Sequence, residues 1–379
     1  MSEKHHIHLH LARMGGSEMH YIEDAFRTNW VAPLGPNVEA FENSLEQYYK
    51  PRHAAVLSSG TAAIHLALVM LGIKAGDEVI VQSLTFCASA NPVTYLGAKP
   101  VFVDSEPDTW NISPTLLKKA IDDRIAKTGH KPKAIIAVDL YGMPAKLDEI
   151  EQIAKRYDIP LIEDSAEAMG SIYNGRICGS YGRYGILSFN GNKMITTSGG
   201  GALLCNTPEE KNKAIFYATQ AREKAEYYQH KETGYNYRMS NICAGIGRGQ
   251  MDVLEEHLAH HKMLHDIYQD AFKDVKGISV HSNPNSRFDS NYWLTNILID
   301  KEICGKDCTQ VMHRLAESGI ESRRLWKPMH QQPVFAEAPT YTDGTADRLF
   351  NQGLCLPSGP CVSKKDAEFV VKTIKEFLS

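Results

Sequence analysis

The sequence lacks the features of a secreted, membrane-bound or nucleic-acid-binding protein. None of its apolar runs approaches the ~18 residues that a membrane span needs, and its start, MSEKHHIHLHLARMGG, has no apolar signal-peptide core. Basic residues do not predominate, with 41 Lys and Arg against 45 Asp and Glu and a formal net charge of −4. No basic surface for nucleic acid or anionic membrane is therefore implied, and we expect a cytoplasmic protein.

Paired cysteine motifs are also absent. The chain has eight cysteines, scattered without a Cys-x-x-Cys spacing. Two of them, Cys304 and Cys308, are close enough in sequence to share one face if a single helix holds both. We interpret the cysteines as reduced thiols: Cys87, Cys178, Cys205, Cys243, Cys304, Cys308, Cys355 and Cys361.

Histidines gather near the N-terminus, at His5, His6, His8 and His10. On an extended strand the last three would share one face, where they could bind a metal adventitiously. No acidic or cysteine partner follows at ligand spacing. The sequence therefore predicts no functional metal.

Short strand-like runs alternate with helical segments over the first 206 residues. This alternation is typical of an α/β fold with a mostly parallel sheet covered by helices on both faces. From about residue 250 a long amphipathic helix (250–272) is expected, which divides the chain into a large domain (1–250) and a smaller α/β domain (251–379). Strands are expected at 76–83, 99–105, 132–142, the start of 159–171, 185–190 and 200–206, and helices at 60–72, 91–98, 113–129 and 147–158.

Small polar residues precede the helix expected at 60–72. Ser59, Gly60 and Thr61 directly follow a short apolar run, and backbone amides at a helix start bind anions. The alternative is a plain helix cap made by Ser59 or Thr61. In parallel sheets ligands bind at the carboxyl ends of the strands, so this segment is a candidate phosphate site.

Other strand ends supply an aromatic ring, an acid and an amine. Phe86 follows one strand, and Asp164 ends another, where it caps the next segment or binds a positive ligand atom. Lys193 stands in SFNGNKMITTSGGG, and a desolvated lysine at a ligand site attacks carbonyls to form Schiff bases. A phosphate site, an acid, a stacking ring and an amine are what pyridoxal phosphate (PLP) requires. We interpret Gly199, Gly200 and Gly201 as a turn into the next strand beside the cofactor.

Blocks of sequence along nearly the whole chain support this interpretation. They are NWVAPLGPNVEAFE, SSGTAAIHLAL, GDEVIVQSLTFCASANPV, GAKPVFVDSEPDTWNI, IEDSAEAMGS, SFNGNKMITTSGGGAL, GYNYRMSNICAGIGRGQ and LWKPMHQQPVF. Together they resemble the DegT/DnrJ/EryC1/StrS family of PLP-dependent sugar aminotransferases. The resemblance implies the aspartate-aminotransferase-like fold (PLP fold type I), PLP as cofactor and a homodimer with shared active sites.

The resemblance also implies residue roles. Lys193 would hold the cofactor covalently, Asp164 would pair with its pyridine nitrogen, Phe86 would stack on its ring and Glu167 would lie near its ring hydroxyl. Some relatives that remove oxygen from sugars carry histidine at the lysine position, so Lys193 favours the aminotransferase branch. The phosphate would be bound by Ser59, Gly60, Thr61 and Ser188, and by Asn236 and Arg238 of a neighbouring subunit.

The substrate is also inferred from resemblance. The stretches NWVAPLGP, QAREKAEYYQH and RRLWKPMH resemble the branch that aminates C4 of UDP-2-acetamido-4-keto-2,6-dideoxyglucose on the route to bacillosamine-type glycans, with L-glutamate as amino donor. Arg222, Lys327 and His330 could then supply charge to a diphosphate and Trp326 a flat apolar face; the alternative is surface charge and a buried aromatic. A GDP- or dTDP-linked sugar, a catalytically silent sugar-nucleotide-binding regulator and a fold-type I lyase also stay open.

Overall fold

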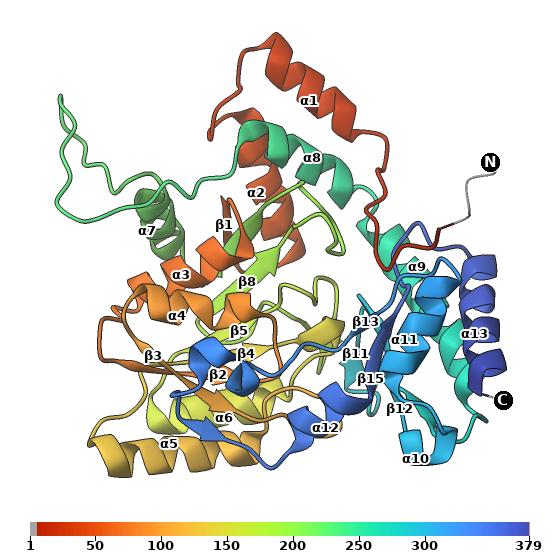
Figure 1. Ribbon diagram of the computed structural model, residues 1–379. Helices are drawn as coiled ribbons and strands as arrows, with labels where there is room; N and C mark the ends of the chain where they lie inside the picture. Colours follow the sequence, from red (N-terminus) through yellow and green to blue (C-terminus); the bar gives the residue numbers. More distant parts are fainter. Residues whose placement is uncertain (1–5, 379) are drawn as a thin grey trace.

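The computed structural model describes residues 6–378 (Figure 1), so the prediction for His5 lies outside the described residues. A central eight-stranded sheet forms the larger part of the molecule, and within it only β9 runs antiparallel to its neighbours. The mostly parallel α/β fold is therefore confirmed. In spatial order the strands are β1 (His53–Leu57), β9 (Gly201–Cys205), β8 (Tyr184–Ser188), β5 (Leu161–Asp164), β4 (Ala134–Val138), β2 (Glu78–Gln82), β3 (Lys99–Val103) and β14 (Thr340–Tyr341).

Helices cover both faces of this sheet because its inner strands are apolar on both sides. Along β2, Val79 and Val81 pack with one layer of helices, whereas Ile80 packs with the other. The first layer consists of α3 (Gly60–Met70), α4 (Asn91–Tyr95) and α7 (Pro208–Ala218), and the second of α5 (Pro114–Thr128) and α6 (Leu147–Tyr157). At one end, α1 (Glu18–Arg27) and α2 (Pro36–Tyr48) pack against α8 (Asn241–Met251).

The C-terminal part contains a four-stranded antiparallel sheet with its own core. Residues of α9, α11 and α13 pack on this sheet (Figure 1). The elements are β10 (Ile278–Val280), β12 (Thr295–Ile299), β15 (Gly353–Leu356), β13 (Arg323–Arg324), α9 (Leu254–Phe272), α11 (Cys308–Glu317) and α13 (Lys364–Leu378). The remaining elements are a small sheet of β11 (Phe288–Asp289), β6 (Ile172–Tyr173) and β7 (Arg176–Ile177), the helices α10 (Lys301–Cys304) and α12 (Thr345–Gln352), and four short 3₁₀ turns at Cys87–Ser89, Leu140–Gly142, Met329–Gln331 and Pro333–Phe335.

Two segments cross the division predicted at residue 250. Ile7, from the N-terminal end, pairs with Ile320 and packs in the core of the C-terminal part. In the other direction, β14 adds to the edge of the large sheet beside β3. The boundary itself stays a prediction.

One expectation about helices is wrong, and one possibility is not realised. The helix expected over 250–272 is interrupted: α8 ends at Met251 and α9 begins at Leu254, because Val253 leaves helical geometry (φ −115°, ψ 6°). Cys304 and Cys308 do not share a helix, since α10 ends at Cys304 and Gly305 turns the chain with φ +69°. Within residues 6–378, no helix is long and apolar enough to cross a membrane.

Candidate active site

A cavity of about 310 Å³ opens where several strands of the large sheet end. It lies beyond the carboxyl ends of β1, β2, β5 and β8, the edge at which parallel sheets bind ligands. The C-terminal part closes it with two tryptophans. The predicted residues that line it are Ser59, Gly60, Thr61, Phe86, Asp164, Glu167, Ser188, Lys193 and Trp326.

The Lys193 amine is held between a carboxylate and an aromatic ring. Its Nζ lies 3.2 Å from Oε1 of Glu167 and 4.0 Å from the centre of the Trp293 ring. The Trp293 indole is itself fixed, because its Nε1–H donates to the carbonyl of Asn192 at 2.6 Å. The lysine side chain is only 13% exposed, so its amine is directed at the cavity rather than at bulk water.

Asp164, at the end of β5, is a buried carboxylate fixed by a chain of hydroxyls. Ser89 Oγ donates to its Oδ2 at 2.6 Å, and Thr85 Oγ1 lies 2.8 Å from Ser89 Oγ. Burial raises the pKa of the Asp164 carboxyl, an effect that the Ser89 hydrogen bond opposes. A positively charged ligand atom would offset the cost of burying this carboxylate.

The Glu167 carboxylate is held by a backbone amide on the side that faces away from Lys193. Its Oε2 accepts a hydrogen bond of 2.7 Å from the backbone N–H of Tyr141, which leaves Oε1 facing Lys193. Tyr141 has the left-handed φ of 56°, which is unusual for a residue other than glycine. Such backbone strain is typical of functional sites.

The start of α3 lines the cavity and carries the predicted helix cap, whereas its role as a phosphate site stays a prediction. Ser59 Oγ caps the helix by accepting from the N–H of Ala62 at 3.0 Å, while the first amides of a helix have no partner within it. Gly60 lies so close to Ser188 that an added Cβ would be 3.2 Å from the serine Cβ. A Cβ on Gly201 would be 2.4 Å from the Gly60 nitrogen, so glycine is required where β9 passes this helix start.

Two predicted residues lie on an extended arm that connects α7 and α8, outside the lining of the cavity (Figure 1, green). Asn236 forms a bridge with Thr219 at the base of the arm. The Arg222 guanidinium stacks over the ring of Tyr228 at 4.1 Å. The structure does not bring either residue to the cavity of the same chain.

Arg238 is engaged within its own chain. Its Nη1 donates to Glu42 Oε1 at 2.5 Å and to the carbonyl of Val56 at 2.9 Å, and its side chain is 9% exposed. These contacts satisfy part of the hydrogen-bonding capacity and the charge of the guanidinium. A role of Arg238 at a neighbouring cofactor stays a prediction.

The LWKPMH segment divides between the cavity and its surroundings. Trp326 lines the cavity with its ring 5.4 Å from that of Phe86. His330 is used structurally, because its Nδ1 lies 2.6 Å from Ser83 Oγ and its Nε2 2.9 Å from Asp347 Oδ1. Lys327 is exposed and does not line the cavity.

Sequence reasoning missed several residues of the cavity. Ser89 lies three positions after Phe86, and its spacing from a strand end was the available signal. Asn192 directly precedes Lys193 in the SFNGNK block, which was its available signal, whereas Trp293 carried no local signal because it comes from a segment 100 residues beyond Lys193.

The chain belongs to the DegT/DnrJ/EryC1/StrS aminotransferase family, whose model matches residues 12–375. It is 47% identical over 372 residues to a Bacillus subtilis (strain 168) protein named "Putative pyridoxal phosphate-dependent aminotransferase EpsN", covering 97% of this chain and 95% of that protein. It is 34% identical to a GDP-perosamine synthase of Escherichia coli O157:H7, with 99% of both chains covered. It is 33% identical to the UDP-4-amino-4-deoxy-L-arabinose–oxoglutarate aminotransferase of Shewanella sediminis (strain HAW-EB3), with 94% of both covered.

Solved structures agree with this assignment. The crystal structure of a DegT DnrJ EryC1 StrS aminotransferase from Brucella abortus superimposes with a TM-score of 0.89 at 28% identity, covering 96% of this chain and 95% of that one. The protein is thus a PLP-dependent sugar aminotransferase with the fold type I architecture. The predicted cofactor, enzyme class and fold are confirmed.

Proposed function

We propose that the cavity transfers the amino group of L-glutamate to the C4 ketone of a UDP-linked 4-keto-6-deoxy sugar, UDP-2-acetamido-4-keto-2,6-dideoxyglucose. The observation that carries the aminotransferase chemistry is the Lys193 amine, 3.2 Å from Glu167, in one cavity with the buried Asp164. The nucleotide and the sugar rest on the sequence blocks and on the names of relatives.

The residues of the cavity fit PLP. When bound, PLP supplies an electron sink for the carbanion formed at the amino carbon. The start of α3 with Ser188 offers hydrogen-bond donors to its phosphate, Phe86 offers a ring face, and the Asp164 carboxylate offers a partner for the protonated pyridine nitrogen. Lys193 supplies the amine that anchors the cofactor covalently.

Lys193 also carries the proton in this proposal. Once glutamate has displaced it, the freed amine removes the α-proton of the donor, and it delivers a proton to C4 of the sugar in the second half-reaction. Glu167 and Trp293 flank the amine and hold it in the cavity during both steps. When bound, PLP would hold the amino group between the two half-reactions, so that glutamate leaves as 2-oxoglutarate before the sugar enters.

The names of relatives support amination at C4 of the sugar and glutamate as the amino donor. The arabinose enzyme acts, by its name, on a UDP-4-amino sugar with oxoglutarate as counterpart. Another relative, from Campylobacter jejuni subsp. jejuni serotype O:23/36 (strain 81-176), is named as a UDP-4-amino-4,6-dideoxy-N-acetyl-beta-L-altrosamine transaminase and is 31% identical over 347 residues. GDP-perosamine synthases are as similar in sequence, so the nucleotide is the feature to test first.

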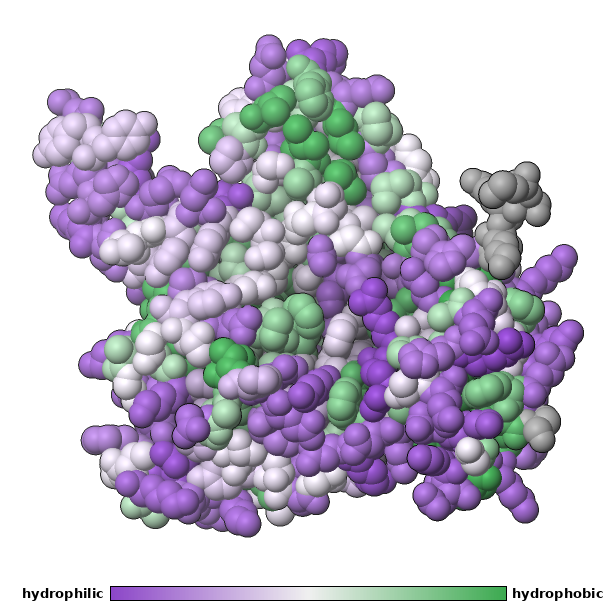
Figure 2. All heavy atoms as spheres, in the orientation of Figure 1, coloured by the Kyte–Doolittle hydropathy of each residue, from purple (hydrophilic) through white to green (hydrophobic). Residues whose placement is uncertain are grey.

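The enzyme is further proposed to act as a homodimer with shared sites. Hydrophobic side chains gather on the surface over α1 and the loop after it (Figure 2). Met19 and Phe26 of α1 are about 60% exposed, and Trp30, Val31 and Leu34 are at least 41% exposed. Such a patch marks a protein interface, and it lies beside α8, which follows the arm that bears Asn236.

The substrate is tested with a panel of UDP-, GDP- and dTDP-linked 4-keto-6-deoxy sugars. Each is incubated with the holoenzyme and L-glutamate, and mass spectrometry detects the exchange of the ketone oxygen for an amine. The UDP-linked N-acetyl sugar is expected to react best, and the Lys193→Ala variant is expected to aminate none. Preferred amination of a GDP-linked sugar would replace the UDP assignment, and absence of 2-oxoglutarate formation from glutamate would contradict the enzyme chemistry.

A further inference from the structure

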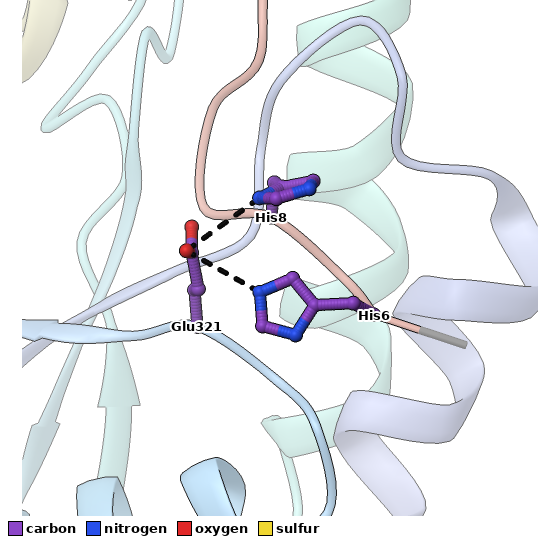
Figure 3. Close-up of side chains that lie close together, drawn as sticks. All are labelled: His6, His8 and Glu321. Atoms are coloured by element: carbon purple, nitrogen blue, oxygen red, sulfur yellow. Dashed lines mark hydrogen bonds and ion pairs between the residues drawn. The ribbon is translucent and has the colours of Figure 1, made fainter. Parts of the chain in front are cut away.

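His6 and His8 meet Glu321, which is distant from them in sequence, at one point of the surface (Figure 3). His6 Nε2 lies 3.3 Å and His8 Nδ1 lies 3.5 Å from the same oxygen, Oε1 of Glu321. The two imidazoles lie at 75° to each other with ring centres 4.6 Å apart. The three potential ligand atoms all lie within 4.8 Å of one another.

The two nitrogen–oxygen distances match the edges of a tetrahedral metal site. With metal–ligand bonds of about 2.0–2.1 Å, neighbouring ligand atoms in a tetrahedron are ~3.3–3.4 Å apart. The two nitrogen–oxygen distances of 3.3 and 3.5 Å are close to this value. Two imidazoles and one carboxylate also form a ligand set that zinc uses with a fourth position left to water.

The carboxylate is already oriented for this role. Glu321 Oε2 accepts a hydrogen bond of 2.9 Å from the N–H of Leu9, which leaves Oε1 free to face both imidazoles. Backbone bonds fix the same junction, from Ile7 N–H to the Gly319 carbonyl and from Glu321 N–H to the Ile7 carbonyl, both 2.9 Å. A carboxylate held by a backbone amide in this way loses little freedom when it binds a cation.

Space exists for further ligands. His6 and Glu321 line a surface hollow of about 250 Å³, together with Ser322 and Arg323. Both histidines are about half exposed, with 48% and 46% of their side chains accessible. Water can therefore complete the coordination sphere, and the nearby Arg323 favours an anionic fourth ligand such as hydroxide or chloride.

We propose that His6, His8 and Glu321 form a site for a divalent cation of the zinc class, which clamps the N-terminal segment around Ile7 to the C-terminal part of the molecule. The local sequence indicated no metal because no acidic partner follows the histidines at ligand spacing; the fold brings Glu321 to them from more than 310 residues away. His10 does not take part, since its Nε2 lies 3.0 Å from Nε2 of the buried His261. The site is separate from the PLP cavity, whose lining contains none of its three ligands.

Zinc binding to the holoenzyme, without an affinity tag and after removal of bound metal by a chelator, tests the proposal. Isothermal titration with Zn²⁺ alone at pH 8 is expected to show a site that the His6→Gln/His8→Gln double variant lacks or binds at least ~30-fold more weakly. The matched control is His53→Gln, a partly exposed histidine at the start of β1 with an acid, Glu46, at 4.0 Å but no second histidine. This control is expected to bind zinc like the wild type.

Further readouts distinguish loss of the metal site from misfolding of the variant and from zinc that binds to PLP. Both variants are expected to keep the visible cofactor band and the aminotransferase activity, and Co²⁺ in place of Zn²⁺ is expected to give tetrahedral d–d bands only when His6 and His8 are present. Zinc is expected to raise the Tm of the wild type and the control but not of the double variant. Equal zinc affinity and equal Co²⁺ spectra in wild type and double variant, or no zinc binding by the wild type, would overturn the proposal.

Discussion

Asp164 depends on the hydroxyl of Ser89 for its orientation. In Ser89→Ala the carboxylate loses a 2.6 Å hydrogen bond, and we expect kcat to fall about 10-fold, since partners of active-site groups contribute on that order. In Asp164→Asn the charge itself is removed, and a loss on the order of 100-fold or more is expected. Steady-state kinetics with glutamate and the keto sugar measure both losses. The control is Ser44→Ala, whose hydroxyl only bonds to the Ala40 carbonyl within α2.

The test depends on which variant, Ser89→Ala or Asp164→Asn, loses more kcat. If Asp164→Asn keeps wild-type kcat, the carboxylate does not pair with the cofactor. If Ser89→Ala loses as much as Asp164→Asn while its KM for glutamate is unchanged, the serine acts on the reaction directly.

Residues at strand ends were predictable from the sequence, whereas residues brought in by tertiary packing were not. Lys193, Asp164 and Phe86 each follow an apolar run, so the rule for parallel sheets located them. Trp293 reaches the Lys193 amine only because the C-terminal part closes over the sheet, and Glu321 meets His6 and His8 for a similar reason. No periodicity or spacing in the local sequence encodes such contacts.

At the level of elements, β9 must pass the start of α3 at close range. A Cβ on Gly201 would lie 2.4 Å from the nitrogen of Gly60, and overpacking of this kind costs about 1–3 kcal/mol. Gly201→Ala is therefore expected to lower the free energy of unfolding by that amount and to weaken PLP binding, because the displaced helix start is the proposed phosphate site. Urea denaturation and cofactor titration measure the two effects.

Gly199 in the same run is the matched control. A Cβ there would meet no atom within 4 Å, so Gly199→Ala is expected to leave stability within about 0.5 kcal/mol of the wild type. Equal effects of the two substitutions would contradict the account of this turn.

The alternation of strands and helices was read correctly from the sequence because each inner strand is a short apolar run between turn residues. Element ends shifted by a few residues, as at β2, which spans Glu78–Gln82 instead of 76–83. The break between α8 and α9 was missed because residues 250–272 keep a helical apolar pattern through Val253. Amphipathic periodicity does not report a kink at a residue that tertiary packing moves out of helical geometry.

Stability of the whole molecule is expected to fall in acid through buried histidines. Burial, and then the nearby His265, lowers the pKa of His281 to about 3, whereas a histidine in the unfolded chain titrates near 6.5. Below pH ~6.5 the unfolded state therefore binds the additional proton, and this residue makes the unfolding free energy fall by about 1.4 kcal/mol per pH unit until the folded pKa is reached. Above pH 7 its contribution is constant.

The effect of His281 on the pH dependence of stability is tested by comparing the unfolding free energy of His281→Gln with that of the wild type. The raised pKa of Asp139, about 6 through burial, acts in the opposite direction, but it is common to both proteins and cancels. Urea unfolding is measured between pH 7.5 and 5. As the pH falls over this range, the free energy of unfolding of His281→Gln is expected to decline less steeply than that of the wild type. The free energy of the exposed His313→Gln is expected to decline as steeply as that of the wild type. A variant whose unfolding free energy declines as steeply as that of the wild type would contradict the assignment.

The apolar surface over α1 is expected to be buried in a homodimer. Phe26 is 60% exposed within the single chain, so a charge at this position would be desolvated on association. Phe26→Glu is expected to shift the protein from dimer to monomer in sedimentation velocity experiments. Val334→Glu, at a 79% exposed position away from α1, is the control, and a wild-type monomer or an unaffected Phe26→Glu dimer would argue against this interface.

The most direct test of the central claim is to find the lysine that holds the cofactor. Borohydride reduction of the PLP-loaded enzyme fixes the Schiff base as a stable amine, and peptide mass spectrometry then locates the phosphopyridoxyl group. The account predicts modification of Lys193, in the peptide that contains SFNGNK, and its loss together with the visible cofactor band in Lys193→Ala. Modification of another lysine, or an unchanged band in the variant, would contradict the assignment of Lys193 as the covalent anchor.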